Sequence, residues 1–279
     1  MLRKIDIKKE EKQLYAAFDD CMQRVKGKTF YEGFAREKIK HSMQVVGAGN
    51  YILKNEKKFK NRSEAYLKLG KLVNLFHDIG RFKEIELLSK APASKHDHGY
   101  YSYEILKELG YDDLRLLLPV KQHGNLAEAL EEDIEFQKIK DAQLKKEVEE
   151  LYGLVKDADK IANLYLIKYD GRIFKDLFFA GLTEEAKFAP ISPNVLSSLE
   201  HKTLVKKSDC VSFSDRLVQI LCFAFEIYNR SSFEFILRHN LFENLFDELD
   251  VYCPDKEQGT FIRTYVTTYV HDKYANMAA

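Results

Sequence analysis

Apolar side chains recur at intervals of three or four residues along most of this chain of 279 residues, and this period places them on one face of an α-helix. Leu14, Phe18, Met22 and Val25 show the pattern within one segment near the start. Only 13 glycines and 5 prolines interrupt it, and 45% of the residues are hydrophobic, enough to bury a full core. We therefore predict an all-α protein built as a helical bundle.

Two predicted helices in the first half of the chain carry ionisable residues. One spans about 37–53 and has His41 near its start. The next begins after Ser63, a residue type that often caps helix N-termini, and ends at a glycine. His77 and Asp78 then fall in its last turn.

Three further predicted helices follow. One begins near His98, after a polar loop. The following one ends near His123 and contains Pro119, which should kink it. A long helical stretch then runs from about residue 131 to residue 168.

The helical pattern breaks after this stretch. The segment YDGR is a predicted turn, and the residues from 175 to 192 are rich in Phe, Gly and Pro. We therefore expect a boundary near Tyr169. The predicted parts are an N-terminal helix in 1–30, a core in 31–169 and a helical C-terminal extension in 170–279.

The overall charge and the cysteines argue against several classes of protein. Lysine and arginine total 44, as do aspartate and glutamate, so no net field attracts nucleic acid or an anionic membrane. The most apolar stretch, 217–225, is far shorter than the ~20 residues of a membrane span. The four cysteines form no CxxC pair, and the first residues do not resemble a secretory signal. We expect a cytoplasmic protein without a membrane partner, and nucleic acid is a disfavoured ligand.

The adjacent pair His77 and Asp78 is the clearest sign of chemistry in the residues themselves. It follows the apolar run KLVNLF, so two ionisable side chains meet a packed helix. Burying them without a partner would be costly, and a divalent cation would satisfy both. The alternative is a histidine at a helix C-terminus beside a solvated aspartate that pairs with Arg81. The residues alone leave both interpretations open.

Five short motifs occur in a defined order: HSMQV at 41, FHDIGR at 76, HGYYS at 98, QHG at 122 and DADKIANL at 157. Together they resemble the signature of the HD-domain metal-dependent phosphohydrolases, over about half of the chain. The resemblance implies an HD-domain helical bundle with additional C-terminal helices. In that family the first His, the His-Asp pair and a late Asp bind one divalent metal. The ligands implied in this chain are His41, His77, Asp78 and Asp159.

Asp157 and Asp159 compete for the last of these positions. Asp159 is preferred because ADKIANL is similar to the ADRLHNM segment of the family's guanosine tetraphosphate hydrolases, which also aligns Asn163. Residues 157 and 159 point about 200° apart on a helix, so only one can readily face the metal. Asp157 would then lie behind the ligands or in solvent.

A second metal is implied by His98 and His123, which occupy the places of additional ligands in family members with two metals. His96 competes with His98, but HGYYS aligns on His98, and His96 is expected in an exposed loop. The chain departs from the family in two places: QHGN has one histidine where many members have two, and Ser102 stands where glycine is common. The ligand types imply a divalent transition metal, namely Mn, Fe, Co, Ni or Zn, with Mg also compatible.

The resemblance implies hydrolysis of a phosphoester or phosphoanhydride in a nucleotide or another small phosphorylated metabolite, by water that the metal activates. Asp78 would orient or deprotonate that water. Basic and amide side chains would bind the substrate, and the candidates are Arg81, Lys121, Lys160 and Asn163. Arg81 and Lys160 are also candidates for catalysis. The alternative is a non-catalytic HD module that binds a nucleotide or a partner protein, and the Phe-rich C-terminal helices could form a homo-oligomer interface.

Overall fold

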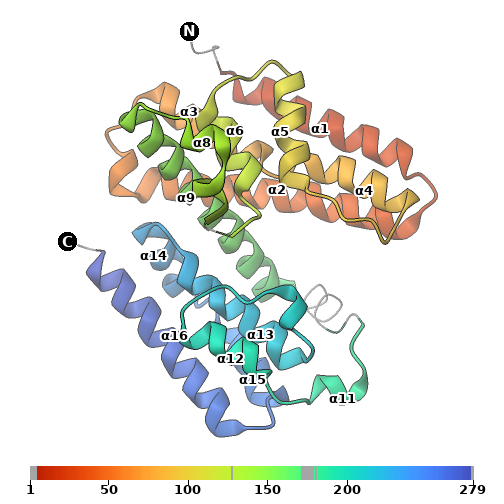
Figure 1. Cartoon of the computed structure of the whole chain (residues 1–279), viewed down its shortest axis with the longest axis vertical. Coiled ribbons are helices and arrows are strands. Elements are labelled where there is room, and N and C mark those ends of the chain that lie inside the picture. Colours follow the sequence, from red (N-terminus) through yellow and green to blue (C-terminus); the bar gives the residue numbers. More distant parts are fainter. Residues whose placement is uncertain (1–4, 127, 171–178, 180, 278–279) are drawn as a thin grey trace. The chain divides into compact units, whose positions relative to one another are not determined.

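The computed structural model describes residues 5–126, 128–170, 179 and 181–277. These residues form helices and the loops between them (Figure 1). These residues contain no strand, so the prediction of an all-α protein is confirmed. The contacts divide the chain into two units, Met1–Asp159 and Lys160–Ala279. The division falls inside a helix, whereas the boundary expected at Tyr169 coincides with the end of that helix.

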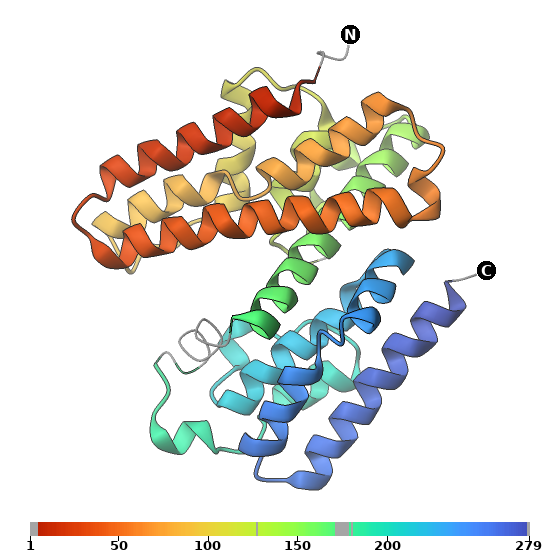
Figure 2. The ribbon, with the colours of Figure 1, turned by 180° about the vertical axis from the view of Figure 1, so that it is seen from behind.

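The first unit contains most of the residues of interest. Its helices are α1 (Ile7–Arg24), α2 (Thr29–Asn55), the 3-10 helix η1 (Lys57–Phe59), α3 (Glu64–Phe76), α4 (Gly80–Lys90), α5 (His98–Glu108), α6 (Leu114–Gln122), α7 (Glu128–Glu132), α8 (Ile134–Gln137) and the first part of α9 (Ala142–Tyr169). Helices α1, α2 and α4 lie side by side (Figure 2), and α6 packs against α3 and α5. Their apolar faces form the core of the unit, with Leu14, Ile52, Val73 and Leu116 fully buried.

Capping residues set several helix ends as predicted. The Ser63 side chain accepts a hydrogen bond from the Tyr66 N–H at the start of α3. Gly110, with a φ of +82°, follows the end of α5 in the left-handed conformation that glycine adopts readily. Pro119 lies inside α6, and the helix continues to Gln122.

Three predicted helix boundaries were wrong. Helix α2 begins at Thr29, so His41 lies in the middle of the helix. No proline lies between Thr29 and His41, and Gly33 costs the helix only about 1 kcal/mol. Helix α3 ends at Phe76, and His77 and Asp78 lie directly after it in a short turn before α4. The long stretch from 131 is broken, because Asp133 caps the short helix α8 and a new helix begins at Ala142.

The second unit contains the end of α9 and the remaining helices: α11 (Glu184–Lys187), α12 (Pro193–Glu200), the 3-10 helices η2 (Lys207–Asp209) and η3 (Cys222–Glu226), α13 (Phe213–Leu221), α14 (Arg230–Arg238), α15 (Glu243–Tyr252) and α16 (Lys256–Asn276). Helix α13 packs against α15, and α14 packs against α16. Phe233, Leu245 and Phe246 of the Phe-rich segment are buried in this core. The predicted YDGR turn lies outside the described residues after Asp170.

Among the described residues, no helix combines the length and the apolar character that crossing a membrane requires.

Candidate metal centre

Five helices of the first unit bring six ionisable side chains to one region. His41 lies in the middle of α2, the His77–Asp78 pair follows α3, His98 begins α5, His123 follows α6, and Asp159 lies on α9. Five of them form two groups, His41–His77–Asp159 and His77–Asp78–His123, and within each group the ligand atoms lie within 4.8 Å of one another. His77 belongs to both, so the groups are adjacent.

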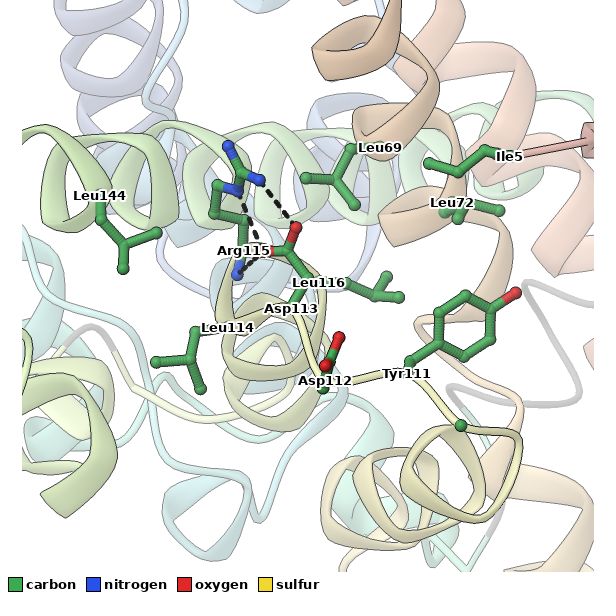
Figure 3. A pocket seen from close by; sticks show the side chains of 11 residues that line it. Ile5, Leu69, Leu72, Tyr111, Asp112, Asp113, Leu114, Arg115, Leu116 and Leu144 are labelled. Carbon is green, nitrogen blue, oxygen red and sulfur yellow. Dashed lines mark hydrogen bonds and ion pairs between the residues drawn. The ribbon is translucent and has the colours of Figure 1, made fainter. Parts of the chain in front are cut away.

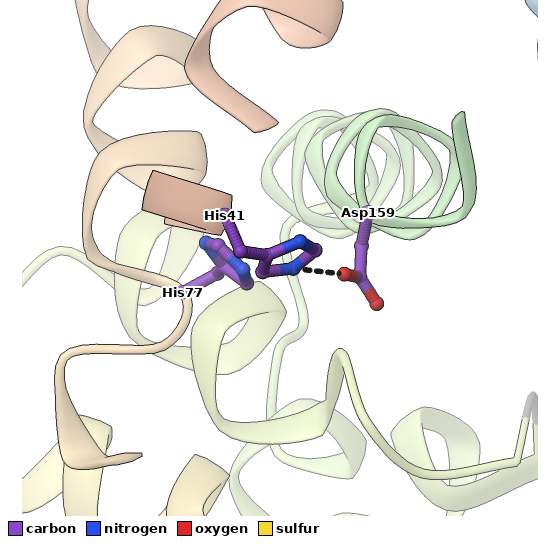
Figure 4. A group of neighbouring side chains, drawn as sticks. All are labelled: His41, His77 and Asp159. Atoms are coloured by element: carbon purple, nitrogen blue, oxygen red, sulfur yellow. Dashed lines mark hydrogen bonds and ion pairs between the residues drawn. The ribbon is translucent and has the colours of Figure 1, made fainter. Parts of the chain in front are cut away.

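The first group joins α2 and α9 across the turn after α3 (Figure 4). His41 Nε2 lies 2.8 Å from Asp159 Oδ1, and the rings of His41 and His77 are 5.7 Å apart at their centroids. Ligands of one divalent ion lie roughly 3 Å apart, since each is about 2.1 Å from the ion, so this spacing suits shared coordination. The structure places Asp159 in this group, whereas Asp157 is fully buried and belongs to neither of the two groups found among the described residues.

The second group is centred on the carboxylate of Asp78, and His98 lies beside it. Asp78 Oδ1 lies 3.3 Å from His123 Nε2 and 3.5 Å from His98 Nε2, and Asp78 Oδ2 lies 3.8 Å from His77 Nε2. The ring of His123 lies 5.1 Å from that of His77 and 5.1 Å from that of His98. Three imidazoles therefore point one nitrogen each at a single carboxylate.

Backbone carbonyl groups orient two of these imidazoles. His77 donates its Nδ1–H to the carbonyl oxygen of Asn74 at 2.9 Å, and His123 donates its Nδ1–H to that of Val120 at 2.8 Å. Burial lowers the pKa of His77 to about 4 although Asp78 opposes the shift, so this ring is neutral at pH 7. A neutral ring that donates at Nδ1 has an unprotonated Nε2, the state in which imidazole binds a metal.

Two of the Nε2 atoms lack hydrogen bonds. His77 Nε2 and His98 Nε2 are buried and have no hydrogen-bond partner among the described residues. Such atoms are costly to bury and are rare in native proteins. Neutral imidazoles and ionised carboxylates together form a deprotonated donor set, which fits a divalent transition metal. The residues present therefore fit the metal that the sequence predicted.

The solvated-aspartate alternative is wrong, because Asp78 is only 3% exposed. The ion pair between Asp78 and Arg81 that this alternative included is present, since Arg81 Nε lies 3.3 Å from Asp78 Oδ1. The Arg81 guanidinium also donates a hydrogen bond to Glu84 at 2.7 Å. This ion pair does not account for the buried nitrogens of His77 and His98, so it accompanies the candidate metal centre and does not replace it.

Lys38 is a second cation at Asp78, and it lies outside the sequence motifs that indicated the other residues. Its Nζ lies 3.5 Å from Asp78 Oδ2. Burial would raise the pKa of Asp78, but the cations Lys38 and Arg81 hold it well below its usual range, so the carboxylate is ionised. The available signal was the position of Lys38 one helical turn before His41.

Ser102 is a further residue that sequence reasoning did not assign. Its hydroxyl oxygen accepts the Gly80 N–H at 2.8 Å and lies 3.0 Å from the His77 carbonyl oxygen and 2.9 Å from that of His98. A Cβ at Gly80 would clash with the His98 carbonyl oxygen and the Ser102 backbone. The turn after α3 thus fits closely against the start of α5, which fixes His77 relative to His98.

The remaining predicted residues lie in other settings. Lys121 pairs with Asp133 at 2.7 Å and with Glu135 at 3.8 Å. Lys160 pairs with Glu226 at 2.7 Å within the second unit, and Asn163 is half-buried on α9. His96 was expected to be exposed but is half-buried, because it forms hydrogen bonds with Ser94 and Tyr101.

A cavity of about 470 Å³ lies elsewhere in the first unit, between α3, α6 and α9 (Figure 3). Apolar side chains such as Leu69 and Leu144 line much of it. Its one arginine, Arg115, donates to Asp113 and to Glu147 at 2.7–2.9 Å, so its charge is already compensated. This cavity contains none of the six candidate ligands.

A family model described as the HD domain matches residues 39–164. Residues 39–164 form an HD domain. All six candidate ligands fall within these residues, and members of the HD-domain superfamily bind divalent metals and are commonly hydrolases. A comparison with curated proteins and a comparison with solved structures gave no match.

Proposed function

We propose that the HD domain is a metal-dependent phosphohydrolase that cleaves a phosphoester or phosphoanhydride of a nucleotide or another small phosphorylated metabolite. The observation that carries the proposal is the pair of buried nitrogens on His77 and His98, which lack hydrogen bonds beside an ionised, buried carboxylate. A purely structural role would leave both nitrogens without a hydrogen bond, whereas metal binding uses their lone pairs.

The donors divide between two positions. His41, His77, Asp78 and Asp159 would hold one divalent ion, and Asp78, His98 and His123 would hold a second, with Asp78 shared. Divalent metals at such sites lower the pKa of water and polarise the phosphoryl group. The nitrogen-rich donor set favours Mn, Fe, Co, Ni or Zn over Mg.

The side chains around these ligands have separate tasks. Because its pKa is held well below the usual range, Asp78 binds a proton weakly, so it serves as a ligand and orients water better than it accepts a proton. Arg81 and Lys38 supply positive charge at the same carboxylate and are placed to neutralise phosphate oxygens. Glu84 holds the Arg81 guanidinium at 2.7 Å, which reduces the freedom of that side chain.

The experiment combines metal analysis with a substrate panel. The full chain is purified without chelator, its metal content is measured, and phosphate release is assayed with nucleotides, sugar phosphates and phosphoanhydrides in the presence of Mn, Co, Ni, Zn or Mg. We expect bound transition metal and turnover that a chelator abolishes and added metal restores. Tight nucleotide binding without turnover of any substrate would refute the proposal and support a non-catalytic binding module.

A further inference from the structure

Two phenylalanines and a lysine follow one another along α2 at intervals of four residues. Phe30, Phe34 and Lys38 form this series, which we call the α2 aromatic track, and its C-terminal end lies one turn before His41. The rings of Phe30 and Phe34 are 6.4 Å apart, and Lys38 Nζ lies 5.9 Å from the centroid of the Phe34 ring. The same Nζ lies 3.5 Å from Asp78, so the track is continuous with the candidate metal centre.

The exposure of these rings is not explained by core packing. Phe30 is 75% exposed, the highest value among the large apolar side chains of the described residues, and Phe34 is half-buried. By contrast, the helix face that packs on α3 and α4 carries fully buried residues such as Val45 and Ile52. Large aromatic side chains left partly open beside a polar site are well suited to bind the flat face of a ligand.

We infer that the α2 aromatic track is the base-binding subsite of the HD domain and that the substrate is therefore a nucleoside phosphate. The inference rests on the proposed function, which places the phosphate at Asp78. The base stacks on Phe34 with Phe30 at its outer edge, and the phosphate lies between Lys38 and Arg81. Phe34 and Lys38 are about 6 Å apart along the helix axis, which leaves room for the ribose between base and phosphate.

The size and charge of the track favour this ligand over a macromolecule. Two rings and one ammonium group match a single base and its phosphate, whereas a nucleic-acid strand would use a series of stacking residues along a basic groove. A second copy of the chain would need about 800 Å² on each side, far more than two phenylalanine side chains provide. Lys38 also gives the track a positive charge at its inner end, where the phosphate belongs.

The test measures base preference in binding, independently of turnover. The probes are the phosphonate analogues of adenosine 5′-monophosphate and ribose 5-phosphate, in which a methylene group replaces the ester oxygen so that neither is hydrolysed. Calorimetric titration of the full chain, as purified with its metal, should show about 5- to 100-fold tighter binding of the adenosine compound. Phe34→Leu should remove most of this preference, and Phe30→Leu should reduce it by a smaller factor.

The matched control is Tyr15→Leu on α1, which deletes a 44% exposed aromatic ring that is not part of the track and should keep the wild-type preference. Thermal unfolding of each variant checks that the fold is retained. Equal binding of the two probes by the wild type, or a preference that survives Phe34→Leu, would overturn the inference. A change of oligomeric state in Phe30→Leu with an unchanged base preference would also overturn the inference, because the track would then be a contact between two copies of the chain. Failure of the proposed function looks different, because the base preference would remain without phosphate release from any substrate.

Discussion

Asp78 in the first unit and Asp215 in the second are both almost completely buried, and the two carboxylates have different surroundings. Asp215 in the second unit accepts hydrogen bonds from the Ser192 N–H and hydroxyl at 2.7 Å and from the N–H groups of Val211 and Ser212 at 3.0 Å. The polar contacts that the described residues make with the Asp78 carboxylate in the HD domain come from ionisable groups at 3.3–3.8 Å, namely Lys38, His77, Arg81, His98 and His123.

The difference separates a carboxylate with a structural role from one that is a candidate metal ligand. Four short hydrogen bonds from backbone and hydroxyl donors satisfy Asp215, which completes the capping box of α13 with Ser212 and connects α13 to the start of α12. The contacts of Asp78 are longer, and two of the surrounding imidazoles keep a buried nitrogen without a hydrogen bond. A buried charge whose neighbours remain unsatisfied is a better sign of a missing ligand than burial alone.

The largest expected effect is the loss of activity when Asp78 is replaced by asparagine, and the same replacement at Asp215 is the comparison. Asp78→Asn should lower metal-dependent phosphate release by about 1000-fold or more, because it removes the charge shared by both metal positions. The protein should remain folded. Activity assays at saturating metal, with circular dichroism as the check on folding, measure both effects.

Asp215→Asn is the matched variant in the second unit. It places an amide NH₂ among four donors and should reduce the free energy of unfolding by about 3 kcal/mol while leaving the metal content unchanged. Wild-type activity in Asp78→Asn, or metal loss in folded Asp215→Asn, would break the distinction between the two carboxylates.

The next effect concerns the number of metals. The groups of potential metal ligands among the described residues all lie in the HD domain, so metal bound by the chain should depend on that domain alone. His123→Ala should lower the content from about two ions per chain to about one and reduce activity by roughly 100-fold. His239→Ala, a half-buried histidine on the second unit, should change neither value. A count of one ion that His123→Ala does not alter would exclude the second position.

The sequence predicted which candidate ligands lie together better than it predicted their surroundings. His41, His77, Asp78 and Asp159 were proposed as ligands because short sequence motifs resemble those of the HD family, and the structure brings these residues to one region. Lys38 and Ser102 were missed because their roles depend on contacts with residues 40 and 25 positions away, at Asp78 and His77. Lys121 looked equally suited to bind phosphate, and only tertiary packing reveals its pairing with Asp133 and Glu135.

Acid should affect the two units differently when metal is removed. Burial lowers the pKa of His77 to about 4 and that of His98 to about 2, against about 6.5 in the unfolded chain. Between pH 6.5 and 4 the unfolded state binds more protons, so the free energy of unfolding of the HD domain should fall by about 3 kcal/mol for His77 alone. The lowered pKa of Asp78 acts only below this window.

The second unit offers the comparison. Among the described residues of the second unit, no histidine is buried, so this unit lacks the buried neutral imidazoles that destabilise the HD domain in acid. Amide hydrogen exchange, corrected for its intrinsic pH dependence, should show protection falling in α3 before α13 as the pH is lowered. Equal loss of protection in both helices would contradict the assignment of buried neutral histidines to the HD domain alone.

The smallest effect distinguishes two lysines with nearly equal exposure. The Lys38 side chain is 21% exposed and lies 3.5 Å from Asp78, whereas that of Lys121 is 22% exposed and lies 2.7 Å from Asp133. Lys38→Gln should lower kcat/KM about tenfold, mainly through KM, because one contact between a charged group and the phosphate is lost. Lys121→Gln should stay within about twofold, since its charge is already compensated. A larger loss of kcat/KM in Lys121→Gln than in Lys38→Gln would indicate that the phosphate binds near α6 and not near Asp78. That result would favour the role that the sequence suggested for Lys121.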